Sequence, residues 1–350
     1  NLPVVPITDL HIKNNDLAVA TQGRSIYILD DLSPLQLYQP NLATQPLHVF
    51  KPAPAFRMMS AGRRRAAAVA NSGEANTGDN PPTGVVIPFY IGSKQPDTLK
   101  ATVKILTKGQ ELIKEYSTTH KDNKLELRTG LNQFVWDMNY PEGEKVPESV
   151  ILWNRARMVV TAPPGEYIAR FIMGKDSVEQ TCTLLPDPNY PATQQDYEAQ
   201  FAFLRKAAAK FDEVVIAQKD ITDLRNQMQD YTKRLGADCP KEVKDLTDEI
   251  NKKLTPIEEA LHQTKAKSGQ DVLNYPIRLD DKLSSVYRTA AVGYTAPARQ
   301  VVEAYEEVAG QIDAELAKLK AVITTDLPRL NTLIRERNLP TITPAAKSKE

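Results

Sequence analysis

The chain has 350 residues, in which 44 Lys and Arg residues balance 44 Asp and Glu residues. A net charge of zero provides no overall field that would attract nucleic acid or acidic lipid, and no apolar run is long enough to span a bilayer. We therefore expect no nucleic-acid partner and no membrane span, and the length allows two or three domains.

Residues 1–56 are strand-like and interrupted by prolines, and their clearest feature is a predicted β-hairpin. Two apolar runs, 17–21 and 25–29, flank a link that contains Gly23, which is the pattern of two antiparallel strands around a turn. A lone hairpin is marginally stable in water. We therefore expect this one to belong to a larger sheet.

Residues 57–84 lack any apolar period and are rich in Gly, Asn, Ser and Pro, so we predict a linker loop. Arg63, Arg64 and Arg65 lie in it without interleaved aromatic residues. A solvated loop explains them better than a nucleic-acid or membrane site.

Residues 85–190 carry the pattern of a β-domain. Ala101, Val103 and Ile105 alternate with polar residues, and Phe134 and Trp136 alternate in a later run. Turns are predicted at 108–109, 163–165 and 174–176, and strands at 99–105, 110–117, 124–128, 132–138, 166–173 and 177–185. Short strands at this spacing predict an Ig- or fibronectin-like β-sandwich.

Residues 191–340 have helical periodicity and predict a four-helix antiparallel bundle. The first helix ends at Gly236, the second begins near Pro240, a third begins with Asp280 as its N-cap, and a last long helix contains Pro328, which should bend it. Residues 341–350 are predicted to be a flexible tail. The predicted fold class is thus multidomain, β then α.

Two sets of carboxylates deserve a catalytic interpretation. Glycoside hydrolysis needs two carboxyl groups roughly 5–9.5 Å apart, and the candidates are Asp30 with Asp31, and Asp137 with Glu142. No His, Arg or Tyr cluster accompanies either set, so we favour turn chemistry for Asp30, Asp31 and Asp137.

The remaining chemistry is sparse. The four histidines, including His262, show no metal-ligand spacing, and no nucleotide or nucleophile motif occurs, so we expect no metal and no cofactor. Whether Cys182 and Cys239 pair stays open. An irregular polar loop around Pro276 supplies binding candidates, and the alternative is a structural plug whose side chains cap helix ends. The candidates are Gln270, Asp271, Asn274, Tyr275 and Arg278.

Three phrases carry a family resemblance: residues 16–35, the Gly-x-Asn-x-Phe-x-Trp-Asp run that ends at Asp137, and residues 268–283. Together with Gly78, Asn80, Pro81, Pro82 and Gly84, they resemble the C-terminal part of bacterial sortilin-like, neuraminidase-repeat (BNR) propeller proteins labelled as glycosyl hydrolases. The chain departs from that pattern at Gln22, Ser25 and Tyr27.

The resemblance implies that residues 1–56 are the last strands of a propeller and the connection that follows them. The other blades would lie upstream, in line with a chain that is a processed or excised piece. It further implies an extracytoplasmic location, with the upstream propeller and other envelope proteins as partners. We expect a non-catalytic structural or interaction module. One alternative is part of a hydrolase whose active site lies mainly in the absent propeller. Another is a carbohydrate- or peptide-binding module, for which Trp136 and Trp153 are the aromatic candidates.

Overall fold

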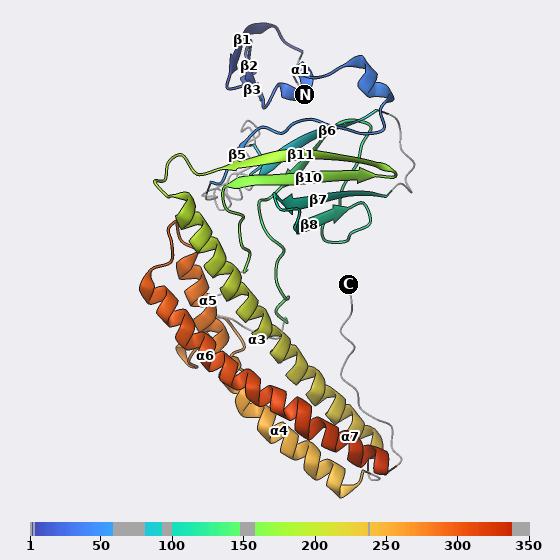
Figure 1. Cartoon of the computed structure of the whole chain (residues 1–350), viewed down its shortest axis with the longest axis vertical. Coiled ribbons are helices and arrows are strands. Elements are labelled where there is room, and N and C mark those ends of the chain that lie inside the picture. The colour runs from blue at the N-terminus through green and yellow to red at the C-terminus, as the bar shows by residue number, and fades with distance from the viewer. Residues whose placement is uncertain are drawn as a thin grey trace. The chain divides into compact units, whose positions relative to one another are not determined.

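The computed structural model describes residues 2, 4–58, 81–92, 100–147, 158–236 and 239–337. Most of the predicted linker with its three arginines, Gly78 and Asn80, Trp153 and the predicted tail lie outside the described residues. Along the chain, β-sheets come first and long helices follow, so the prediction of a multidomain β and α chain is confirmed at that level (Figure 1).

The chain folds as two compact units that interleave along the sequence. Unit 1 consists of Asn1–Pro141 and Thr161–Gln194, and unit 2 of Glu142–Val160 and Gln195–Glu350. The predicted domain boundary at residue 190 is therefore close to the second point at which the chain passes from unit 1 to unit 2, after Gln194. It missed the excursion 142–160, which leaves the sheets and joins the helical unit.

The first sheet of unit 1 contains β1 (Ile7–Lys13), β2 (Asp16–Thr21) and β3 (Ile26–Leu29) in that order, all antiparallel. The predicted hairpin is β2 with β3. The sequence pattern missed β1, because the pairing register shifts between Ile7 and Asp9 and so breaks the apolar alternation of the strand. A short helix α1 (Ser33–Gln36) and a 3₁₀ turn η1 (Pro40–Thr44) follow.

Two further sheets of unit 1 face each other across one hydrophobic core. The smaller has the order β4-β6-β9 and the larger the order β5-β11-β10-β7-β8. Aromatic rings from the two sheets meet in the core. The ring centres of Phe89 and Phe171 lie 5.2 Å apart, and those of Tyr167 and fully buried Trp136 lie 4.9 Å apart. The bounds are β4 His48–Val49, β5 Ala55–Phe56, β6 Val85–Ile91, β7 Ala101–Thr107, β8 Leu112–Ser117, β9 Gly130–Trp136, β10 Gly165–Met173 and β11 Asp176–Leu185.

The period-two pattern explains why these strands bury one face. In β10 the buried residues are Tyr167, Ala169, Phe171 and Met173, with partly exposed residues between them. One predicted strand is wrong: residues 124–128 form only an isolated bridge from Lys124 to Ser117. That segment runs beside the outer edge of β8, where the Leu125 N–H donates to the Ser117 carbonyl at 2.9 Å.

Unit 2 is built on α3 (Gln194–Leu235), α4 (Lys241–Leu261), α5 (Leu279–Ala290) and a long final helix. Gly236, at φ 53°, ends α3 as predicted. The final helix runs through α6 (Arg299–Ala321), a π-helical turn η4 (Val322–Asp326) and α7 (Leu327–Glu336). Pro328 lacks the N–H that an α-helix needs, and the wider turn directly precedes it.

The described parts of the excursion, residues 142–147 and 158–160, contact the helices at several points. The Glu144 N–H donates to Asp212 Oδ1 at 2.8 Å, and Lys219 pairs with the Glu144 carboxylate at 2.7 Å. Met158 and Val160 lie in the helical core, and the Tyr287 hydroxyl donates to the Val159 carbonyl at 2.9 Å. Apolar burial and these polar contacts explain why the segment belongs to unit 2.

Candidate functional sites

Asp30 and Asp31 follow β3 directly, and the structure gives them different surroundings. Asp30 is exposed. Asp31 has φ 51°, and its Oδ1 accepts hydrogen bonds from Asn15 Nδ2 at 2.9 Å and from the Ser33 N–H at 3.0 Å. The Asp31 N–H donates in turn to Asp16 Oδ1 at 2.9 Å. The Asp31 carboxylate thus ties the β1–β2 turn to the start of α1.

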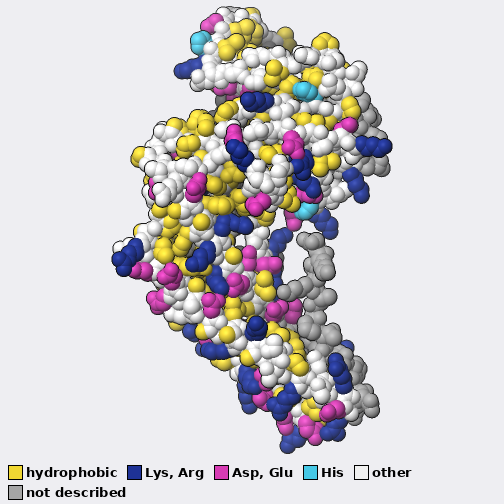
Figure 2. Space-filling model, in the orientation of Figure 1, with side chains coloured by type: hydrophobic (Ala, Val, Ile, Leu, Met, Phe, Trp, Pro, Cys, Tyr) yellow, Lys and Arg dark blue, Asp and Glu magenta, His cyan; other side chains and the backbone are white. Residues whose placement is uncertain are grey.

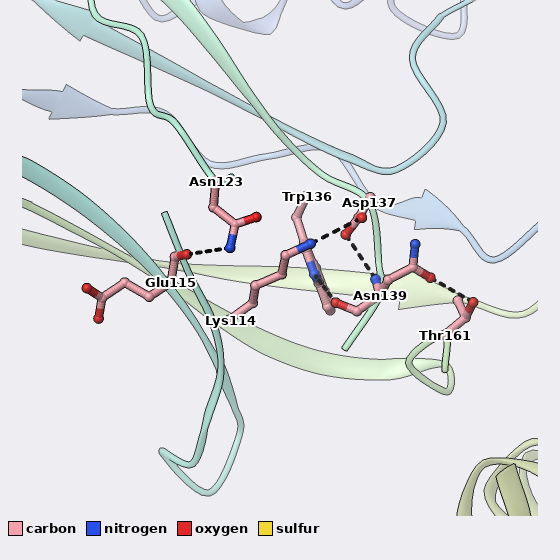
Figure 3. A network of polar contacts seen from close by, with 7 residues as sticks. All are labelled: Lys114, Glu115, Asn123, Trp136, Asp137, Asn139 and Thr161. Atoms are coloured by element: carbon pink, nitrogen blue, oxygen red, sulfur yellow. Dashed lines mark hydrogen bonds and ion pairs between the residues drawn. The ribbon is translucent and has the colours of Figure 1, made fainter. Parts of the chain in front are cut away.

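Asp137 lies at the centre of a polar network at the end of β9 (Figure 3). Its Oδ2 pairs with Lys114 Nζ at 3.3 Å, and its Oδ1 accepts the Asn139 N–H at 3.1 Å. Trp136 Nε1 donates to the Asn139 carbonyl at 3.4 Å, and the Thr161 hydroxyl donates to Asn139 Oδ1 at 2.9 Å. The carboxylate closes a turn after the strand, as its residue type predicted.

The same network changes the acidity of a neighbouring tyrosine. Burial raises the pKa of Tyr116, and the charge of Asp137 raises it further. The Lys114 ammonium nitrogen also lies 5.1 Å from the centre of the Tyr116 ring.

Glu142, the carboxylate considered together with Asp137, belongs to unit 2, whereas Asp137 belongs to unit 1. The arrangement around Asp137 therefore orders a strand end and a turn.

The loop between α4 and α5 holds the five binding candidates. Asp271 accepts three hydrogen bonds, from the Lys267 N–H at 2.6 Å, the Ser268 N–H at 3.0 Å and the Ser268 hydroxyl at 3.0 Å. These backbone donors, Lys267 first, lower its pKa. Asp271 thus closes the turn at Lys267 and Ser268, directly before the short 3₁₀ turn η3 (Asp271–Leu273), and does not cap the end of η3.

The other four candidates of this loop behave differently. Gln270, Asn274 and Tyr275 are exposed, Tyr275 to 37%. Arg278 is the N-cap residue of α5, with φ −109° and ψ −170°, and its Nε is buried without a hydrogen-bond partner. The loop thus combines one structural carboxylate with an exposed rim.

Sequence reasoning missed a buried polar cluster at the two ends of this loop. Asp280, only 1% exposed, accepts from Gln218 Nε2 at 3.2 Å through Oδ2, and the same oxygen lies 2.7 Å from His262 Nδ1. Asp280 Oδ1 accepts the Asp281 N–H at 2.7 Å. The predicted N-cap role of Asp280 is wrong, because the residue lies in the first turn of α5 and points inward.

A signal for this cluster was present in the sequence. Asp280, Ser284 and Tyr287 are four and three residues apart, and so share one helix face, and all three are buried. A carboxylate on the same face as a core tyrosine predicts a buried acceptor that needs donors. Gln218 on α3 and His262 after α4 supply them, so one carboxylate links three parts of unit 2.

Other reactive groups offer no assembled chemistry in the described part of the chain. Burial raises the pKa of Cys182 to about 12, which disfavours a nucleophilic thiolate. No group of three or more His, Cys, Asp or Glu residues placed to hold a metal occurs among the described residues. A groove of about 240 Å³ in unit 2 is lined largely by apolar side chains such as Ile216, Leu316 and Ile323, and none of the candidate residues lines it.

Within the described residues, no helix is both long enough and apolar enough to span a membrane. Comparison with protein-family models, with curated proteins and with solved structures found no match for this chain. The geometry of the chain is therefore the evidence on which a function is argued.

Proposed function

We propose that this chain is a non-catalytic structural and interaction module whose first sheet, β1–β3, is covered and extended by polypeptide outside this sequence. The observation that carries the proposal is that this sheet exposes large apolar side chains on both of its faces. The register assigns the faces: Leu10 and Ile12 oppose Val19 and Leu17 on one, and Ile26 and Ile28 oppose Ala20 and Ala18 on the other.

The exposure of these side chains is large. Leu10 and Ile12 are each 60% exposed, Ile26 is 65% and Ile28 is 66% exposed. Hydrophobic side chains are visible on the surface of this part of unit 1 in Figure 2. An antiparallel sheet of a complete protein has at most one solvated face, and that face is polar. Apolar side chains on both faces are typical of a sheet that packs between two layers.

The edges of the sheet support the same proposal. β1 and β3 are its outer strands, and within the described residues no further strand pairs with either of them. An open edge strand with exposed apolar side chains is a template on which another strand can pair. Native proteins therefore cover such edges. Propeller blades are four-stranded sheets packed between neighbouring blades, so the upstream propeller implied by the resemblance would supply both the missing strand and the two covering layers.

The carboxylate environments support the non-catalytic part of the proposal. Asp31 and Asp137 each accept hydrogen bonds from groups close in sequence, which is turn and cap chemistry. An extracytoplasmic location and other envelope proteins as partners belong to the same proposal and rest on the family resemblance.

We extend the proposal to the two domains. An Ig-like β-sandwich is supported by three features of unit 1. Its two sheets share one core, Trp136 is buried in that core, and the Tyr167 hydroxyl donates to the Pro163 carbonyl at 2.7 Å. Such sandwiches pair a core tryptophan with a tyrosine that is hydrogen-bonded to upstream backbone. One apolar core shared by α3, α4, α5 and the final helix supports an antiparallel bundle.

The test compares the same substitution in two contexts. Ile26→Lys with Ile28→Lys should reduce self-association and dye binding of the 350-residue chain with little change in its free energy of unfolding. In the protein extended upstream of Asn1, the pair should cost several kcal/mol, because two lysines would enter a covered apolar layer. Lys244→Glu, an exposed change in unit 2, is the control. Equal, small effects in both contexts would contradict the proposal.

A further inference from the structure

The loop between α4 and α5, residues 262–278, is folded and firmly held. Gln263 Nε2 donates to the Pro276 carbonyl at 2.8 Å, and the Tyr275 N–H donates to the Asp271 carbonyl at 2.8 Å. The Asp271 side chain fixes the turn at Lys267 and Ser268. A surface that is ordered before binding loses little conformational entropy when a partner binds, so such a loop is suited to recognition.

This ordered loop presents apolar side chains outward. Leu273 is 82% exposed and Tyr275 is 37% exposed, two residues apart on the same turn. A single exposed leucine is ordinary in a soluble protein. An exposed leucine and tyrosine on one preorganised turn, flanked by the exposed amides of Gln270 and Asn274, match the composition of interface centres, where aromatic anchors are enriched.

The charge of the loop is one-sided. The loop contains three basic residues, Lys265, Lys267 and Arg278, and one carboxylate, Asp271. That carboxylate already accepts three hydrogen bonds. Asp280 and Asp281, which follow the loop, are buried. Lys265 and Lys267 are exposed and make no ion pair among the described residues. The exposed charge of the loop is therefore positive, although the whole chain is neutral.

Arg278 adds a specific donor to this positive surface. Its side chain is partly exposed, and none of the ion pairs among the described residues includes it. Guanidinium groups bind carboxylates through two parallel hydrogen bonds. A partner carboxylate would pair with the charge of the partly exposed Arg278 guanidinium, and the two lysines would favour further acidic residues nearby.

We propose that the α4–α5 loop is a docking site for an acidic peptide segment of a partner protein, with an apolar side chain of the segment against Leu273 and Tyr275 and a carboxylate on Arg278. The site lies within unit 2 and is independent of what covers β1–β3. Binding should weaken with salt, because exposed lysines contribute through screened charge.

The test uses a phage-displayed library of random peptides selected on the immobilised 350-residue chain. Enriched peptides are then synthesised and titrated by fluorescence anisotropy. We expect enrichment in Asp and Glu beside Leu or Phe, and a loss of affinity of at least about fivefold in Leu273→Ser with Tyr275→Ser and in Lys265→Glu with Lys267→Glu. Exposed positions elsewhere, Leu112→Ser and Lys244→Glu, are the matched controls.

The outcomes separate the proposal from its alternatives. Acidic peptides that lose affinity on the loop variants and keep it on the controls would support it. Failure to enrich any peptide, enrichment of neutral or basic peptides, or equal binding to loop and control variants would overturn it. All four substituted loop positions are exposed, so we expect the variants to keep their helices. Circular dichroism of each variant checks this.

Discussion

Among the polar side chains of unit 2 described above, we expect Asp280 to contribute most to the free energy of unfolding. Replacement by Ala removes the acceptor of His262 Nδ1, Gln218 Nε2 and the Asp281 N–H at once. Each hydrogen bond to a charged group contributes about 1.5–3 kcal/mol, but water and local shifts recover part of the loss. Each buried donor left without an acceptor costs about 1–3 kcal/mol, and we expect Asp280→Ala to cost about 3–5 kcal/mol in all.

The assay is urea unfolding followed by the far-ultraviolet helix signal, which reports mainly on unit 2. With a slope of about 2 kcal/mol per M urea, the midpoint should fall by roughly 2 M. Asp245→Ala, the same change at an exposed site on α4, should leave the midpoint in place. A double-mutant cycle with His262→Ala should give a coupling energy of about 1–3 kcal/mol. Equal midpoints for Asp280→Ala and Asp245→Ala, or additive effects in the cycle, would refute this account of the cluster.

Three further predictions follow from single contacts. Gly92→Ala should cost about 2 kcal/mol, because its Cβ would lie 2.2 Å from the Leu42 carbonyl oxygen and 2.5 Å from that of Gln45; Gly109→Ala, whose Cβ would meet only Thr107 Oγ1 at an ordinary contact distance of 3.7 Å, is the control in a thermal melt. Ile312→Asp should cost about 3–5 kcal/mol because Ile312 is fully buried, whereas exposed Lys318→Asp should change little; similar losses on urea unfolding would show that the helix face is wrong. The lowered pKa of Asp271 means that its contribution to loop order is present above the unfolded-state pKa and is lost as the pH falls through the folded value; amide chemical shifts of Lys267 and Ser268 should follow that titration, and should not do so in Asp271→Asn.

Periodicity predicted the long regular elements well because burial on one face determines them. The helix that ends at Gly236 and the alternation in β7 each follow from residues that face a core. Periodicity failed where burial is not periodic. β1 contains a register shift, and the excursion 142–160 enters the helical core through short irregular contacts such as the Val159 carbonyl. Such contacts leave no repeating pattern in a sequence.

The candidate polar residues show a different limit. Residue type alone predicted turn chemistry at Asp137, because its carboxylate acts on a backbone group two residues away. Asp271 likewise acts on backbone groups three and four residues away. The partners of Asp280 could not be predicted in this way. Gln218 is 62 residues distant in sequence, and only the packing of α3 against α5 brings the two side chains together. Local acceptors are predictable from sequence, whereas long-range acceptors require the fold.

The α4–α5 loop combines both kinds of polar residue, and this separates its structural role from its proposed binding role. Asp280 and His262 are buried where the loop joins the helices and should govern unfolding, whereas Leu273 and Tyr275 are exposed and contribute little buried area. Leu273→Ser with Tyr275→Ser should therefore leave the urea midpoint within about 0.5 kcal/mol of the original while it removes peptide binding. A midpoint lowered as far as in Asp280→Ala would mean that the exposed tip supports the helices, and the loop would then be a structural plug instead of a docking site.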